Sequence, residues 1–179
     1  MNNAGISVGD KGPLDQTPQE AVANFDNVIG TNVKGCWFMA RAVSQLMRKH
    51  NHGGSIINVA SILGFRVFPW QVEYTMSKAA VLHMTHSLAL DLARHQIRVN
   101  SLAPGFFLSD INRKLFEKQV GQPDKSHVGA KMTKNIPMRR LGEYRELDGA
   151  LLLLASDKAG SYMTGSTLVV DGGHMHSSL

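Results

Sequence analysis

Two side chains near the middle of the sequence could carry out proton transfer to or from a carbonyl group. Tyr74 and Lys78 stand four positions apart at the start of an expected helix, so both side chains leave the same helical face. An ammonium group beside a phenol favours the phenolate and lowers the pKa of the phenol from about 10 toward neutral pH. Such a tyrosine can donate a proton to a carbonyl oxygen or accept one from an alcohol.

The Tyr74–Lys78 pair alone also fits a solvated helix face. Ser61 favours the catalytic interpretation, because it ends a short apolar stretch and precedes Tyr74 by thirteen positions. A serine hydroxyl at the end of a strand could hydrogen-bond the same carbonyl oxygen that Tyr74 protonates. The structural alternative is a serine that caps the turn after the strand.

The elements that must position these residues alternate between helices and short strands. Apolar residues recur at spacings of three and four over residues 18–29, 31–49, 74–95 and 144–155, which predicts four helices. Thr17, Pro18 and Glu20 form a capping box at the start of the first helix. Short apolar stretches over residues 55–60, 97–102 and 167–170 are typical of strands buried on both faces. Residues 1–18, rich in Asn, Gly, Asp and Pro, are expected to form a loop.

This alternation predicts an α/β fold with a parallel sheet and right-handed crossovers. Ligands of such sheets bind at the carboxyl ends of the strands. The segments that begin at Ser61, Pro104 and Asp171 follow those ends, so the functional site is expected there.

Five segments, in order along the chain, resemble the short-chain dehydrogenase/reductase family. Ser61 followed by Tyr74-x-x-x-Lys78 is similar to the family's serine and Tyr-x-x-x-Lys signature. The other matching segments are Asn2-Asn3-Ala4-Gly5, Asn32 within Thr-Asn-Val-Lys-Gly, Arg98 to Gly105, and Thr164-Gly165 with Val170 to Gly173. The fold implied is the carboxyl-terminal part of a Rossmann-type, doubly wound parallel sheet.

The resemblance implies a role for each matching residue. Tyr74 would be the acid/base, and Lys78 would lower its pKa and bind the nicotinamide ribose. Ser61 would orient the substrate carbonyl, and Asn32 would hold a water in a proton relay that reaches Lys78. The cofactor would be bordered, besides Tyr74 and Lys78, by Asn2, Ala4, Gly5, Pro104, Gly105, Phe107 and Ser109.

The family relation implies an NAD- or NADP-dependent enzyme that interconverts a secondary alcohol and a ketone. A 3-oxoacyl thioester reductase and a sugar or polyol dehydrogenase are both open, and so is the choice between NAD and NADP. Residues 106–136 resemble the family's variable substrate lid, within a single domain that spans residues 1–179. The helices over residues 31–49 and 74–95 resemble those of the family's dimer contact, so a homo-oligomer, either a tetramer or a dimer, is expected.

The family's first mononucleotide-binding half, with its glycine-rich turn, has no counterpart before Asn2. We therefore expect an incomplete domain in which a strand edge and some helix faces lack partners, and which binds the cofactor poorly. The alternative to an enzyme is a catalytically inactive remnant of the family or a partial gene.

Composition narrows the other function classes. The formal net charge of +5 comes from scattered basic residues without a docking motif, so no nucleic-acid partner is expected. No apolar run is long enough to span a bilayer, and the His pairs lack further ligands at metal-binding spacing. The single cysteine, Cys36, lies in an apolar helical stripe, which predicts an inert thiol and suits a cytoplasmic protein.

Overall fold

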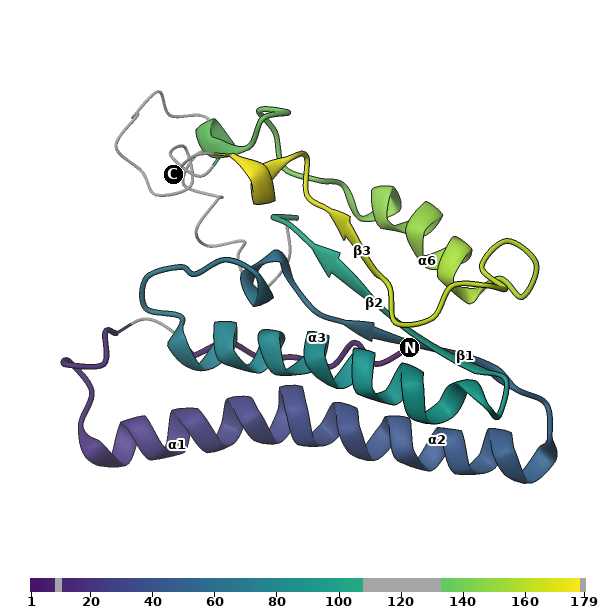
Figure 1. Cartoon of the computed structure of the whole chain (residues 1–179). Coiled ribbons are helices and arrows are strands. Elements are labelled where there is room, and N and C mark those ends of the chain that lie inside the picture. Colours follow the sequence, from purple (N-terminus) through teal and green to yellow (C-terminus); the bar gives the residue numbers. More distant parts are fainter. Residues whose placement is uncertain (9–10, 108–132, 178–179) are drawn as a thin grey trace.

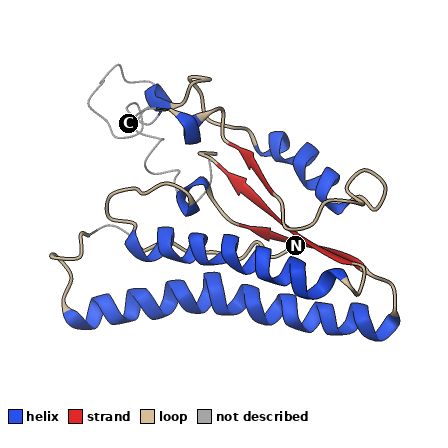
Figure 2. Ribbon diagram, viewed as in Figure 1, coloured by secondary structure: helices blue, strands red, loops and turns tan. Residues whose placement is uncertain are grey.

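The computed structural model describes residues 1–8, 11–107 and 133–177. Every helix and strand expected from the sequence is present, with ends that differ by a few residues (Figures 1 and 2). In chain order the elements are α1 (Pro18–Ile29), η1 (Gly30–Gly35), α2 (Cys36–His50), β1 (Gly54–Val59), η2 (Ile62–Gly64), α3 (Val72–Ala93), β2 (Ile97–Pro104), η3 (Tyr144–Leu147), α6 (Asp148–Ala155), β3 (Thr167–Val170) and η4 (His174–His176).

The strands form a parallel sheet in the order β1-β2-β3, so the predicted α/β architecture is confirmed. β1 pairs with β2 from Gly54↔Ile97 to Val59↔Leu102, and β2 pairs with β3 from Ser101↔Thr167 to Pro104↔Val170. The three carboxyl ends therefore lie on the same side of the sheet, because all three strands run in the same direction.

The opening segment differs from the predicted loop at one point. Asn2 forms a parallel bridge with Asn58, in which its N–H donates to the Ile57 carbonyl at 2.8 Å and its carbonyl accepts from the Val59 N–H at 2.9 Å. The outer edge of β1, which was expected to be unpaired, is therefore covered near its carboxyl end. This pairing joins positions more than fifty residues apart, which a local reading of a polar segment does not detect.

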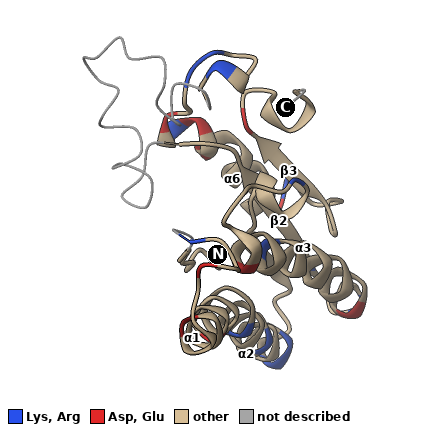
Figure 3. Cartoon of the chain, turned by 90° about the vertical axis from the view of Figure 1, so that its left-hand side faces the viewer, with Lys and Arg blue, Asp and Glu red and all other residues tan. Residues whose placement is uncertain are grey.

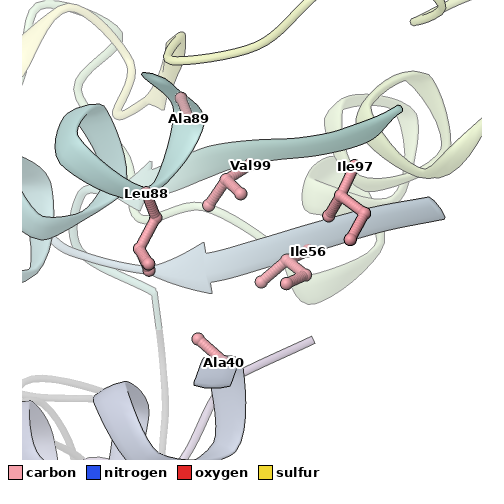
Figure 4. Close-up of a cluster of buried hydrophobic side chains, with 6 residues drawn as sticks. All are labelled: Ala40, Ile56, Leu88, Ala89, Ile97 and Val99. Atoms are coloured by element: carbon pink, nitrogen blue, oxygen red, sulfur yellow. The ribbon is translucent and has the colours of Figure 1, made fainter. Parts of the chain in front are cut away.

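Helices cover both faces of the sheet (Figure 1). Successive residues of a strand point to opposite faces, and Ile56 and Ile57 show this alternation. Figure 4 shows the core on the α2/α3 face, formed by Ala40, Ile56, Leu88, Ala89, Ile97 and Val99. On the α6 face the core consists of Ile57, Leu102 and Leu154. The sheet is thus buried from both sides, which explains why its strands read as short, continuous apolar runs.

Charged side chains are dispersed over the surface. In the view of Figure 3, the basic residues lie on several separate elements rather than on one face. Across the part of the chain that the structure describes, no helix is both long enough and apolar enough to cross a membrane.

Candidate active site

A cleft of about 990 Å³ opens at the carboxyl ends of β1 and β2. Three of the four predicted catalytic side chains, Ser61, Tyr74 and Lys78, belong to its lining. The predicted cofactor-binding residues that line the same cleft are Gly5, Pro104, Gly105 and Phe107. The topology therefore brings these positions together from the opening segment, the end of β1, the start of α3 and the end of β2.

Ser61 sits where β1 ends and η2 begins. Its backbone is extended, and its Oγ accepts a hydrogen bond from the N–H of Leu63 at 3.1 Å. The capping role considered from the sequence is therefore present. The same hydroxyl group belongs to a residue that lines the cleft, and an oxygen that accepts one bond still carries a proton to donate.

Lys78 is held by a main-chain contact that the sequence did not predict. Its Nζ donates to the carbonyl of Val59, the last residue of β1, at 2.9 Å, and only 4% of the residue is exposed. Burial lowers the pKa of Lys78 from 10.5 to about 8, because the ammonium form loses its hydration. The Val59 carbonyl thus fixes the ammonium group at the carboxyl end of β1.

The pKa of Tyr74 shifts in the direction opposite to the one expected from Lys78. Nζ lies 5.6 Å from the centroid of the Tyr74 ring. Burial raises the pKa of the phenol above 10, and the Ser61 hydroxyl opposes this change by hydrogen bonding. Because desolvation outweighs the hydrogen bond, Tyr74 is a protonated phenol at neutral pH, which is the proton-donating form.

Asn32 lies in η1, a short π-helix within the helical run from Pro18 to His50. Its Oδ1 accepts from the N–H of Ile6 at 2.8 Å, and its Nδ2 donates to the Ile6 carbonyl at 3.0 Å and to Ser77 Oγ at 2.9 Å. Short π-helical segments inside α-helices frequently occur at functional sites. The sequence predicted a break between two helices here, whereas Gly30 is helical with φ −56°.

Gly5 links Asn32 to the reacting centre. A Cβ atom at Gly5 would lie 3.3 Å from Lys78 Nζ and 3.5 Å from Asn32 Oδ1. A glycine here lets the backbone pass close to both polar atoms, which thus flank the same point of the chain. The water-mediated relay from Asn32 to Lys78 stays a prediction.

Asn2 and Ala4 are not part of the cleft lining, whereas their neighbours Met1, Asn3 and Gly5 are. The Asn2 amide instead points inward and donates to Asn58 Oδ1 at 2.8 Å. Asn2 therefore anchors the segment that carries Gly5. Contact of Asn2 and Ala4 with the cofactor remains a prediction.

Two predictions extend beyond what the structure describes. Ser109 lies outside the described residues, and so does most of the proposed lid, residues 108–132. The described part of this region includes Phe107, which is buried and pairs with Gly142. The lid over residues 106–136 and the cofactor contact of Ser109 stay predictions.

Two groups of contacts near the reacting centre were not predicted from the sequence. Ser7 and Gln71 both line the cleft, and Ser7 Oγ donates to Gln71 Oε1 at 2.5 Å. The Phe106 ring packs between Phe68 and His174, with centroid distances of 6.3 Å and 5.2 Å. Gln71 could have been noticed because it precedes Tyr74 by three positions, but the other contacts depend on loop conformation.

Cys36 is buried, as the apolar stripe predicted. Its Sγ donates to Asn58 Oδ1 at 3.3 Å, and burial raises the pKa of the thiol, which keeps it protonated at neutral pH. Within residues 1–8, 11–107 and 133–177, no group of three or more His, Cys, Asp or Glu side chains could hold a metal ion.

Known proteins resemble this chain over almost its whole length. A family model described as enoyl-(acyl carrier protein) reductase matches residues 1–175. An uncharacterized oxidoreductase of Thermotoga maritima is 39% identical over 173 residues, which cover 97% of this chain and 65% of the relative. A D-arabinitol 2-dehydrogenase (ribulose-forming) of Candida tropicalis is 35% identical over 176 residues, covering 97% of this chain and 58% of the relative.

A solved structure has a similar fold over almost the whole chain. The crystal structure of a gluconate 5-dehydrogenase from Burkholderia cenocepacia J2315, in complex with NADP and tartrate, superposes with a TM-score of 0.85 at 32% identity. The match covers 99% of this chain and 64% of that one. The chain thus spans between 58% and 65% of the length of these three proteins.

Proposed function

The chain belongs to the short-chain dehydrogenase/reductase family, and we propose that the protein interconverts a secondary alcohol and a ketone with NAD or NADP. The observation that carries this proposal is the convergence of Ser61, Tyr74 and Lys78 on one cleft at the carboxyl ends of the strands. These side chains provide a proton donor, a hydroxyl hydrogen-bond donor and a cation, which is the set that carbonyl reduction requires.

The residues of the cleft fit a nicotinamide nucleotide. Gly5 and Gly105 both line the cleft, and a Cβ at Gly5 would lie 3.3 Å from Lys78 Nζ, so a glycine there leaves this ammonium group uncovered on that side. Lys78 offers ammonium donors suited to ribose hydroxyls, and Pro104 with Gly105 would border the nicotinamide. When bound, the nicotinamide supplies or accepts the hydride.

The side chains of this chain handle the proton. In the reducing direction, Tyr74 donates its phenolic proton to the carbonyl oxygen as negative charge develops there, and Ser61 donates a hydrogen bond to the same oxygen. Burial keeps the phenol protonated, which supports this direction. In the oxidising direction, the Tyr74 phenolate accepts the proton of the alcohol, and stabilisation of that phenolate by the Lys78 ammonium stays a prediction.

The experiment that tests this function follows nicotinamide absorbance while the full-length protein acts on a panel of secondary alcohols and ketones with each nucleotide. We expect turnover with at least one nucleotide. Tyr74→Phe should lower kcat by about 10²–10⁴-fold, because it removes the transferred proton. Its nucleotide affinity should stay within about twofold, because the phenyl ring is retained. Substantial turnover by Tyr74→Phe would show that the acid/base is another group.

The same measurements separate the catalytic proposal from a catalytically inactive member of the family. An inactive protein would turn over no compound of the panel with either nucleotide. Two substrate classes, 3-oxoacyl thioesters and sugars or polyols, belong to the proposal, and members of both classes are needed in the panel.

A homo-oligomer, either a dimer or a tetramer, and a cytoplasmic location are also part of the proposal. Large apolar side chains are exposed along the three helices on one face of the sheet: Val22, Phe25, Trp37, Phe38, Met39, Leu46, Val72, Met76 and Leu90. Exposed apolar residues on neighbouring helices suit a contact with a second copy.

A further inference from the structure

One part of the cleft lining is polar, and we call it the polar wall. It consists of Ser7, Lys11, Glu20, Asn24 and Gln71. Another part is apolar and consists of Ile62, Leu63, Phe68, Phe106 and Phe107. Tyr74 and Ser61 line the same cleft.

Direct contacts hold the polar wall together. Ser7 Oγ donates to Gln71 Oε1 at 2.5 Å, and Lys11 Nζ forms an ion pair with Glu20 Oε1 at 2.9 Å. Gly12 is buried, and a Cβ atom there would lie 3.4 Å from Trp70 Cδ1. The segment that carries Lys11 therefore packs against the residue that precedes Gln71.

Gln71 is tied to the catalytic helix. It is the N-cap of α3, and its carbonyl accepts from the N–H of Thr75 at 2.8 Å. Tyr74 follows three positions later, in the first turn of α3. Gln71 and the proton donor therefore both stand at the start of one helix, and both line the cleft.

The two substrate classes interact differently with such a surface. An aliphatic acyl chain would remove water from an amide, a hydroxyl and an ion pair without returning hydrogen bonds, which is unfavourable. The hydroxyls of a polyol both donate and accept, so they replace the lost water. Lys11 and Glu20 also compensate each other's charge, so this wall presents no excess cation to a carboxylate.

We propose that the polar wall recognises the hydroxyl groups of a neutral polyol or ketose, with Gln71 as a residue that determines this specificity. The inference rests on the proposed function, because it concerns the substrate of the same reacting centre. It predicts that the protein acts on polyhydroxylated substrates and not on acyl thioesters.

The experiment compares probes that share the reacting centre but differ beyond it. The full-length protein is assayed with NAD and NADP on a mixture of pentitol stereoisomers, on 2-pentanol, on a 3-hydroxybutyryl thioester and on a five-carbon aldonate. We expect kcat/KM for the pentitols to exceed that for 2-pentanol by at least about 100-fold, because the site hydrogen-bonds hydroxyls that 2-pentanol lacks.

Variants test whether the polar wall causes the preference for pentitols over 2-pentanol. Gln71→Ala should lower kcat/KM for the pentitols about tenfold, while the value for 2-pentanol stays within about twofold. Ser7→Ala serves as a second variant in case Gln71→Ala unfolds, and it should change the two substrates in the same unequal manner. The matched control is Gln45→Ala, an exposed glutamine on α2 outside the cleft lining, which should change neither value.

Each outcome has a distinct meaning. Turnover confined to 2-pentanol or the thioester, or a preference for the aldonate, would overturn the inference while leaving the proposed function intact. So would an equal loss on pentitols and 2-pentanol in a folded Gln71→Ala or Ser7→Ala variant. Absence of turnover on every probe would instead overturn the proposed function, and the inference with it.

Discussion

The reacting centre and the polar wall lie in one cleft but are built in different ways. Ser61 and Lys78 stand on a strand end and a helix, and Lys78 is fixed by a bond to the main chain of β1. Ser7 and Lys11 lie on the loop that precedes α1, where contacts between side chains hold them. The reacting centre depends on the buried strands and helices that position it, which we call the frame. The polar wall depends on a few exposed or half-buried groups.

This difference separates chemistry from specificity. Changes to the frame should damage stability and turnover together, because the sheet edge positions the catalytic groups. Changes to the polar wall should alter substrate preference and leave the fold intact, because polar groups on surface loops contribute little to stability.

The largest expected effect on the frame comes from Gly105→Ala. The added Cβ would lie 2.6–2.7 Å from the Cβ and Cα atoms of Asp171, so β2 and the segment after β3 must move apart. We expect the free energy of unfolding to fall by about 1–3 kcal/mol and kcat/KM to fall by about 100-fold, because Gly105 lines the cleft. Urea unfolding and steady-state kinetics measure the two losses.

The control for this change is Gly149→Ala in α6, where nothing lies within 4 Å of the added Cβ. An alanine there should leave turnover unchanged and stabilise the protein by about 0.4–1 kcal/mol, since the unfolded chain loses freedom. Equal losses in Gly105→Ala and Gly149→Ala would contradict the importance of the contact between Gly105 and Asp171.

A smaller effect on the frame is expected from the ionisation of Lys78. Burial lowers the pKa of Lys78 from 10.5 to about 8, so between these values the unfolded chain binds more protons than the folded one. Stability should therefore rise with pH in this window, by about 2 kcal/mol from pH 7.5 to 9.5. The rise should be absent from Lys78→Met, and urea midpoints at the two pH values measure it. A flat profile in the wild type would mean that Lys78 is hydrated.

The elements that carry the reacting centre could be predicted because their signals are local. The Thr17–Glu20 capping box sets the start of α1, and the apolar runs set β1, β2 and β3. Once parallel strands are inferred, Ser61 and Pro104 must lie at the same sheet edge as Tyr74.

The remaining features depend on contacts between distant positions. The π-helix η1 forms where the Asn32 side chain binds the main chain of Ile6, 26 positions earlier. No local spacing in the sequence indicates this contact. Lys78 bonds to the Val59 carbonyl, and this contact, like the raised pKa of Tyr74, follows from burial in the assembled fold. The Ser7–Gln71 hydrogen bond joins residues that are 64 positions apart. The polar wall therefore could not be inferred from the sequence.

The most direct measurement of the central claim is a crystal structure of the full-length protein with a nicotinamide nucleotide and an alcohol or ketone bound. The account predicts that the reacting oxygen lies within hydrogen-bonding distance of both Tyr74 Oη and Ser61 Oγ, with Lys78 Nζ at the nucleotide ribose. A substrate oxygen that contacts neither hydroxyl, in a complex that turns over in the crystal, would contradict it.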